Sequence, residues 1–181
     1  MKTLLLSSFL ILVFAHVSAQ ETEVPTRQND IILDPITTIA GMGSLSYERL
    51  LNQDSGVGIH GFFYLGNEDD YDNYRFMQIS PFYRMYFGKK YASGFFIEAF
   101  LPITTIKDSY YYYEPVNPNY YSETEDTETT LGLGFGAGGK WVTKRNIIFE
   151  ASAGIARRFA GNSDMFSSIT AKWMLGIGYR F

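Results

Sequence analysis

The last residues of the chain alternate strictly between two kinds of side chain. One set is apolar up to the final residue, whereas the other contains small, charged and methionine side chains. A period of two is typical of a β-strand with two different faces. The sequence therefore predicts a final strand over residues 168–181. Its apolar face is Ile169, Ala171, Trp173, Leu175, Ile177, Tyr179 and Phe181, and its other face is Thr170, Lys172, Met174, Gly176, Gly178 and Arg180.

The same alternation recurs in seven earlier segments, which predicts an all-β chain of eight strands. The first segment contains Pro35, so we expect that strand to be short or irregular, because a proline removes one ladder hydrogen bond. Residues 31–51 could instead form a single strand. The barrel would then have seven strands, and an odd number would place the two chain ends on opposite sides of the membrane. We therefore favour eight. The earlier segments are 31–39, 44–51, 56–65, 74–87, 94–106, 129–142 and 147–159.

The connections between the predicted strands differ in length. Those at 52–55, 88–93 and 143–146 are short, those at 66–73, 107–128 and 160–167 are longer, and a tight turn at 40–43 breaks the alternation. Short turns on one side and long loops on the other are the arrangement of outer-membrane barrels. We predict an eight-stranded antiparallel up-and-down transmembrane β-barrel. Its first strand pairs with its last, and both termini are periplasmic.

Side-chain size indicates which face of each strand points inward. Gly132, Gly134, Gly136 and Gly138 share one face of a single strand, as expected where eight strands surround a narrow interior. The bulky apolar side chains then face hydrocarbon. On this interpretation Pro81 faces lipid. Aromatic residues near the short turns form a predicted periplasmic girdle: Tyr47, Tyr83, Phe87, Phe95, Trp141, Tyr179 and Phe181.

Five charged residues on the inward faces each lie about three to five residues from a short turn. They therefore fall at a similar depth in the barrel. Strand order places Arg84 beside Glu98, Glu98 beside Lys140, and Lys140 beside Glu150. Because buried charges must be paired, we predict an interior salt-bridge layer that stabilises the barrel, rather than a catalytic or conducting site. Lys172 and Arg180 add to the interior charge balance. The predicted layer is Glu48, Arg84, Glu98, Lys140 and Glu150.

The N-terminal residues predict export. Residues 1–19 combine a basic start, an apolar run and the small-residue pattern Val17-Ser18-Ala19, which is typical of a cleaved signal peptide. A retained membrane anchor is the alternative, but its apolar core is short for spanning. Residues 20–29 are polar and predict a disordered lead. Residues 30–181 are the predicted barrel domain.

Composition excludes several classes of protein. The chain has no cysteine, so disulfides, thiolate metal sites and lipid attachment at cysteine are excluded. The net charge is −4 and no basic stripe is present, which argues against a nucleic-acid partner. No cofactor is predicted.

Three groups of residues are candidate sites. His60 is the only histidine after the predicted signal peptide, and no spacing assembles a serine–histidine–acid group around it, so no catalytic residue is predicted. The acidic loop residues lack a calcium-loop spacing, so simple solvation is preferred to a metal site or to bridging of lipopolysaccharide phosphates. The acidic residues are Asp69, Asp70, Asp72, Glu123, Glu125, Asp126 and Glu128.

The third group is a run of tyrosines within residues 109–121. Tyrosine offers a large contact area with few rotatable bonds, which suits an extracellular recognition loop. Alternatively, the two flanking strands extend beyond the membrane as a hairpin that carries these side chains. Both interpretations stay open. The residues are Tyr110, Tyr111, Tyr112, Tyr113, Tyr120 and Tyr121.

The sequence resembles the small eight-stranded outer-membrane barrels of Gram-negative bacteria, the OmpA-like and OmpW-like group. More narrowly, it looks like the small barrel families common in Bacteroidetes-type bacteria. The resemblance covers the whole chain after the predicted signal peptide. Tyr179 and Phe181 resemble the terminal signal that the barrel-assembly machinery reads. No periplasmic peptidoglycan-binding domain is expected, because nothing follows Phe181. The resemblance rests on residues 45–49, 81–87, 94–99 and 176–181.

The resemblance implies an architecture and a location more than an activity. We expect a non-enzymatic barrel in the outer membrane, with a structural or surface-interaction role through residues 107–128. The expected partners are outer-membrane lipid, lipopolysaccharide, the assembly machinery and an extracellular ligand. An OmpW-like passage for small apolar molecules is the alternative, since four inward aromatic residues could line a pocket. A barrel enzyme centred on His60 or a secreted ligand-carrying barrel is less favoured. The four aromatic residues are Phe62, Phe82, Phe96 and Phe100.

Overall fold

The computed structural model describes residues 27–64, 75–113, 121–160 and 168–181. The predicted signal peptide and residues 20–26 of the predicted lead lie outside the described residues. Strand β1 begins at Asn29, so the end of the predicted lead is part of the barrel. Gln28, one residue earlier, already accepts a hydrogen bond from the Leu50 N–H at 2.8 Å.

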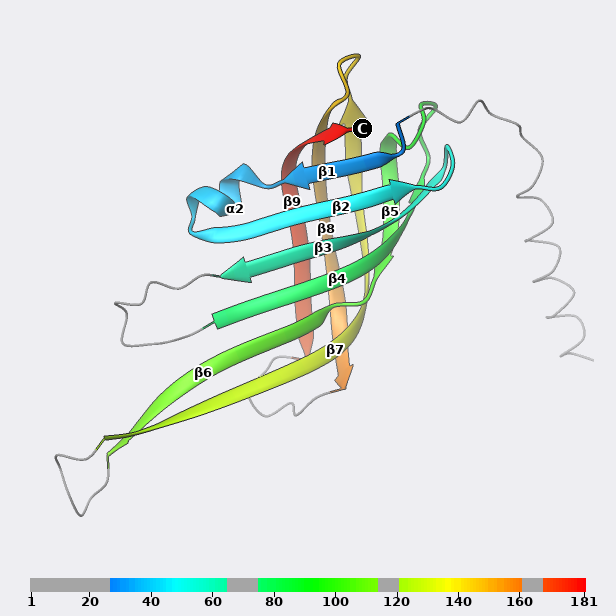
Figure 1. The fold of residues 1–181 in the computed structure, drawn as a ribbon. Coiled ribbons are helices and arrows are strands. Elements are labelled where there is room, and N and C mark those ends of the chain that lie inside the picture. The colour runs from blue at the N-terminus through cyan, green and yellow to red at the C-terminus, as the bar shows by residue number, and fades with distance from the viewer. Residues whose placement is uncertain (1–26, 65–74, 114–120, 161–167) are drawn as a thin grey trace, which may run out of the picture.

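A closed antiparallel barrel forms from eight barrel strands, as predicted (Figure 1). Strands β5 and β6 are two halves of one barrel strand, because β4 and β7 each pair with both. The first strand pairs with the last and closes the barrel. The strands are β1 (Asn29–Leu33), β2 (Met42–Leu50), β3 (Ser55–Tyr64), β4 (Arg75–Tyr86), β5 (Gly94–Phe100), β6 (Ile103–Tyr113), β7 (Tyr121–Val142), β8 (Ile147–Ala160) and β9 (Ile169–Arg180).

The predicted strand over 31–39 is wrong in its second half. Strand β1 ends at Leu33, and the short helix α2 (Pro35–Ile39) follows. Asp34 is the helix N-cap: its Oδ1 accepts from the N–H groups of Ile36 and Thr37 at 3.0 and 3.1 Å. An aspartate cap followed by proline at the first helical position favours a helix start over a strand. β-Branched residues suggested a strand, but this local capping prevailed.

Helix α2 also corrects the connection predicted as a tight turn at 40–43. Residues 34–41 link β1 to β2, and Gly41 supplies the left-handed backbone (φ +79°) that ends them. Figure 1 places α2 away from the short turns and the C-terminus. The exception to the alternation of connection lengths therefore disappears.

The predicted loop over 107–128 is largely strand. β6 continues to Tyr113 and β7 begins at Tyr121, paired from Lys107 opposite Thr127 to Tyr113 opposite Tyr121. β4 pairs with β6 only as far as Lys107, and β8 pairs with β7 only from Leu131. Residues 108–113 and 121–126, here called the extended hairpin, therefore pair with each other beyond their neighbours. Tyrosine and threonine suit a pleated ribbon, and Figure 1 shows the hairpin projecting from the barrel.

Pro81 faces outward, as predicted, and lies beside the break between β5 and β6. The Pro81 carbonyl accepts from the Leu101 N–H at 3.0 Å. An extended residue directs its N–H and C=O to the same side, so the donor that proline lacks would have pointed at this break. The interruption around Leu101 and Pro102 thus explains how a proline is tolerated in the wall.

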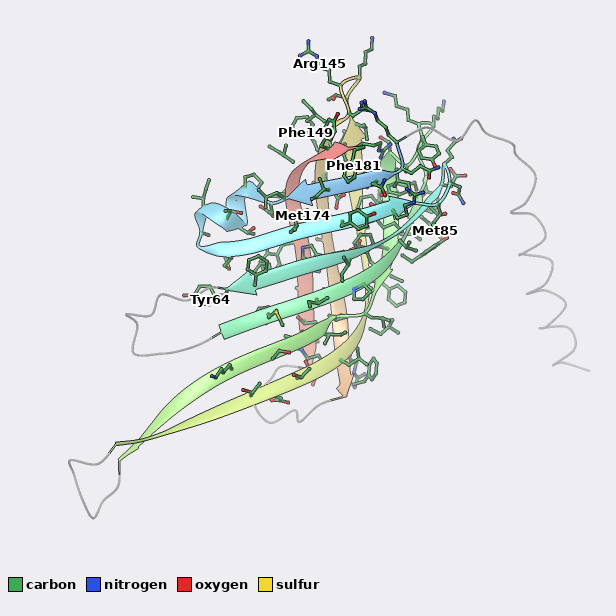
Figure 2. The ribbon with its side chains drawn as sticks, in the orientation of Figure 1. Tyr64, Met85, Arg145, Phe149, Met174 and Phe181 are labelled. Carbon is green, nitrogen blue, oxygen red and sulfur yellow. The ribbon has the colours of Figure 1, made fainter. Side chains whose placement is uncertain are left out.

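The outer surface of the barrel is apolar and the inner surface is small or polar, as the alternation predicted. β9 alternates between exposed odd and buried even positions along nearly its whole length. Side chains such as Phe149 and Phe181 point outward near the short-turn end, while Arg145 lies at a turn tip (Figure 2). All seven residues of the predicted girdle are exposed. An apolar belt of this extent matches contact with hydrocarbon rather than water.

No helix in the described part of the chain has the length and apolarity needed to cross a membrane.

Candidate functional site

Glycines make room for the large side chains inside the barrel. A Cβ on Gly138 would lie 2.6 Å from the Ala151 carbonyl oxygen and 2.7 Å from the Phe96 ring. A Cβ on Gly136 would lie 3.0 Å from Glu98 Oε1. The glycine-rich face of β7 therefore creates the space that aromatic and charged side chains from β5 occupy.

Arg84, from β4, lies at the centre of this interior. Its Nε donates to Glu98 at 2.9 Å, and its Nη1 donates to Glu48 at 3.1 Å. Nη1 and Nη2 also bind the two oxygens of Glu150, at 2.8 and 2.7 Å, in a bidentate pair. The rings of Phe82 and Phe96 lie 4.4 and 4.3 Å from the guanidinium carbon. Arg84 is completely buried.

Lys140, from β7, forms the second centre. Its Nζ lies 3.0 Å from Asp30 Oδ2, contacts Glu48 Oε2 closely, and lies 3.9 Å from Glu150. The Tyr86 hydroxyl donates to Glu48 Oε1 at 2.7 Å. Glu48 therefore links the surroundings of Arg84 and Lys140.

Two cations from β9 complete the arrangement. Lys172 donates to Glu98 Oε1 at 2.7 Å and lies over the ring of Phe82 at 4.4 Å. Arg180 binds both oxygens of Asp30, at 2.7 and 2.9 Å. The last strand is thus attached to the interior through its charged face, as well as to β1 and β8 through its backbone.

These side chains form one interior ion-pair cluster of four cations and four carboxylates, so their formal charges cancel. Each lies in the barrel interior with almost no exposure, and such charges are tolerable only when paired. The cluster crosses the lumen and connects strands that are not neighbours. Its members are Asp30, Glu48, Arg84, Glu98, Lys140, Glu150, Lys172 and Arg180.

The structure brings together all five residues of the predicted salt-bridge layer, but one predicted neighbour relation is wrong. Arg84 lies opposite Glu98, and Lys140 lies opposite Glu150. Glu98, however, lies opposite Gly136, and Lys140 lies opposite Gly94. The predicted neighbours are therefore four residues out of register. Lys140 reaches carboxylates across the lumen instead, which neighbouring-strand reasoning does not include.

The sequence reasoning also missed two participants. Asp30 lies at the start of β1, and Tyr86 follows Arg84 on the same inward face. The available signal was their parity: Asp30 alternates with Ile31, and Tyr86 is two residues from Arg84. Asp30 also borders the segment predicted to be a disordered lead, which separates it from the clear alternation of the later strands.

His60 is buried in the barrel interior, farther from the short turns than the cluster is. Its Nε2 is 3.1 Å from Ser44 Oγ, and its Nδ1 has no hydrogen-bond partner among the described residues. A serine–histidine pair without an orienting acid lacks the geometry of a catalytic triad. A cavity of about 120 Å³ adjoins it. The cavity is lined by His60, Phe62, Phe76, Gln78, Thr170, Ala171, Lys172 and Trp173.

The other predicted sites are only partly within the described residues. The backbone of Tyr110–Tyr113 and Tyr121 belongs to the extended hairpin, while Tyr120, Asp69, Asp70 and Asp72 lie outside the described residues. Glu123, Glu125 and Asp126 are in β7, and Glu128 is half-buried. Within the described ranges, no group of histidine, aspartate and glutamate side chains has the arrangement of a metal site. Tyr179 and Phe181 are exposed on the outer surface.

Comparison with protein-family models and with curated proteins finds no match. Solved structures do match. The attachment invasion locus protein Ail of Yersinia pestis, crystallised with the heparin analogue sucrose octasulfate, is 15% identical with a TM-score of 0.51, over 86% of this chain and 99% of that one. The chain has the fold of the small eight-stranded outer-membrane β-barrels.

Two further barrels are similar to this one at lower scores. Neisserial surface protein A is 13% identical over 85% of this chain and 94% of its own, with a TM-score of 0.47. The N-terminal barrel domain of Pseudomonas aeruginosa OprF is 16% identical over 86% of this chain and 100% of its own, with a TM-score of 0.43.

Proposed function

We propose that this barrel is a non-enzymatic protein of the Gram-negative outer membrane that interacts with a surface partner through its extended hairpin. The observation that carries the proposal is the hairpin itself, in which residues 108–113 and 121–126 continue beyond the strands on either side. Because this hairpin does not contribute to closing the barrel, we infer that it serves for interaction with a partner. We further propose that residues 1–19 direct export, that both termini are periplasmic and that the hairpin is extracellular.

The composition of the hairpin indicates the chemistry of its partner. Residues 107–128 contain six acidic residues, and Lys107 is the only basic one. The same segment contains the tyrosine run, which offers contact area with few rotatable bonds. Ail was crystallised with a heparin analogue. An acidic hairpin repels such a polyanion, so we propose a neutral or cationic partner surface for this chain.

The interior argues against passage of molecules along the barrel axis. The ion-pair cluster crosses the lumen from β4 to β8 and from β7 to β1, so it lies across an axial route. Eight-stranded barrels have interiors that side chains can fill completely. Axial passage of small apolar molecules is therefore not part of the proposed function.

The test uses the purified barrel in nanodiscs of zwitterionic lipid. In one variant, residues 108–126 are replaced by an Asn-Gly turn, which should leave the barrel folded because residues 108–113 and 121–126 pair with each other beyond the neighbouring strands. Poly-lysine and heparin surfaces serve as probes at physiological ionic strength. The intact barrel should bind poly-lysine and not heparin, and the shortened one should bind neither.

A matched control separates the two features of the hairpin. Replacing Tyr110, Tyr111, Tyr112 and Tyr113 by serine keeps every acidic residue. This variant should retain electrostatic binding to poly-lysine but bind less tightly at raised salt, where contact area dominates. Equal binding by the intact and shortened barrels would contradict a recognition role for the hairpin.

A further inference from the structure

The closing seam of the barrel covers only part of β9. β1 pairs with β9 through four residues, from Asp30 opposite Arg180 to Leu33 opposite Ile177. Beyond that point β1 gives way to α2, and Ala171–Gly176 have no paired strand on that side within the described residues. Figure 1 shows β9 diverging from the sheet that contains β2, β3 and β4. The wall there is made of side chains rather than a hydrogen-bonded strand.

Side chains from other elements cover this edge of β9. Asp34 Oδ2 accepts from the Leu175 N–H at 2.9 Å, and the Gln78 amide donates to the Ala171 carbonyl at 3.4 Å. The Phe62 and Trp173 rings meet edge to face, with centroids 5.5 Å apart, and Phe62 meets Phe76 in the same way at 5.8 Å. Trp173 is also 46% exposed on the outer surface. An aromatic contact, which side-chain rotation can open, therefore separates the interior from the membrane.

The cavity of about 120 Å³ lies behind these rings and has one polar wall. His60 is 1% exposed, and its Nδ1 has no partner within the described residues. The Gln78 amide nitrogen makes two contacts at 3.4 Å, the long limit of a hydrogen bond. Lys172 carries three donors, and one of them binds Glu98. This wall therefore has donor capacity to spare.

We propose that this cavity binds the carboxylate of a single-chain fatty acid whose alkyl chain leaves into the membrane at the unpaired edge of β9, between Phe62 and Trp173. A carboxylate accepts hydrogen bonds only, which matches Lys172 and Gln78. It also matches His60 when Ser44 donates to Nε2 and Nδ1 carries the proton. The mouth, formed by Phe62, Phe76 and Trp173, is apolar and reaches the lipid-facing surface.

The size of the cavity decides the class of ligand. A cavity of roughly 150 Å³ holds one benzene molecule, so this one accommodates a carboxylate and its first few methylenes. The rest of the chain must lie in the seam and along the outer face. The branched head group and two chains of a phospholipid do not fit, and a short soluble carboxylate gains nothing from the aromatic mouth. The site is independent of the extended hairpin.

The experiment exploits the two tryptophans of the chain, Trp141 and Trp173. In a Trp141→Phe background, Trp173 reports energy transfer to cis-parinaric acid, a fluorescent fatty acid, in nanodiscs. Its methyl ester is the control ligand, because it keeps the chain and loses the charge. We expect saturable transfer at one site per barrel, with the acid bound about tenfold or more tightly than the ester.

Lys172→Met tests the head-group contact, and Lys144→Met, at an exposed turn, is its matched control. The first should lower the affinity for the acid to that of the ester, and the second should change nothing. Equal binding of acid and ester by the Trp141→Phe protein overturns the proposal. So does unchanged acid binding in folded Lys172→Met. If Lys172→Met does not fold, the comparison of acid with ester still decides.

Discussion

Arg84 is completely buried and binds carboxylates from three other strands, β2, β5 and β8. Each of these contacts joins β4 to an element at a different position around the barrel. Removal of Arg84 would leave several buried carboxylates without this partner, so its loss should affect stability more than the loss of its packing alone. The cost arises from the carboxylates that remain and less from the arginine that is lost.

Arg84→Met should therefore destabilise the barrel by about 3–5 kcal/mol, the range for breaking a buried ion pair by removing one partner. Urea titration in detergent, followed by the electrophoretic mobility of the folded form, measures the change. Arg145→Met is the control, since Arg145 is exposed at a turn tip. Similar stability of the two variants would show that the cluster does not stabilise the barrel.

Gly138 and Gly61 form a second matched pair at the residue scale. A Cβ on Gly138 would meet the Ala151 carbonyl at 2.6 Å, whereas a Cβ on Gly61 would have no atom within 4 Å. We expect Gly138→Ala to destabilise the barrel by about 1–3 kcal/mol through overpacking, and Gly61→Ala to leave stability almost unchanged. The same urea titration measures both. A neutral Gly138→Ala would mean that the interior is looser than the packing around Phe96 indicates.

Among the elements of the barrel, helix α2 takes the place in the wall where a longer β1 would have paired with β9. Its cap, Asp34, binds the helix N-terminus with one carboxylate oxygen and the Leu175 N–H of β9 with the other. One side chain thus starts the helix and satisfies the exposed edge of the closing strand. The seam between β1 and β9 depends on this local feature as well as on backbone pairing.

Asp34→Ala should weaken the seam, since it removes both the helix cap and the bond to Leu175. The loss should be about 1–3 kcal/mol. Amide hydrogen exchange resolved by NMR should show a faster Leu175 amide, while the amide of Ser152, inside the β8–β9 sheet, stays protected. Asp34→Asn should retain most of the cap and expose the Leu175 amide. An unchanged Leu175 amide in Asp34→Ala would exclude this role for the carboxylate.

At the scale of the whole molecule, the barrel combines an apolar exterior with an interior that contains buried charged and aromatic side chains. The charges of the ion-pair cluster cancel, and its pairs Arg84–Glu150 and Lys140–Asp30 cross the lumen. Within the described residues, the edge of β9 at Ala171–Gly176 has no paired strand on the β1 side, and side chains that include the Phe62 and Trp173 rings cover it.

An ion-pair cluster across the lumen predicts no steady large conductance when the purified barrel is inserted into a planar bilayer. The recording should be made over a range of salt concentrations, with a general porin as the positive control. Sustained ohmic channels would contradict the assignment of the cluster as a plug.

Fractionation tests the apolar belt on the outer surface. The protein should require detergent for extraction, because soluble recovery is incompatible with this belt.

Much of this architecture follows from the sequence. The alternation of apolar and small residues predicted the strands, their two faces and the pairing of first with last, because side-chain direction in a strand is fixed by parity. The glycines of β7 predicted a crowded interior. Parity also placed Glu48, Arg84, Glu98, Lys140 and Glu150 on the inside at a similar depth.

Strand order also predicted that Arg84 lies beside Glu98 and Lys140 beside Glu150. Only the tertiary structure decided which of these residues meet across the lumen. Contacts across the lumen, such as Arg84 with Glu150, depend on barrel diameter and strand stagger, which no single strand encodes. The helix at Pro35–Ile39 replaced a predicted strand because capping by Asp34 outweighed β-branched propensity. The short β1, and with it the aromatic seam beside Trp173, exists for the same reason. Sequence determined what faces inward, and closure of the barrel determined what each inward residue touches.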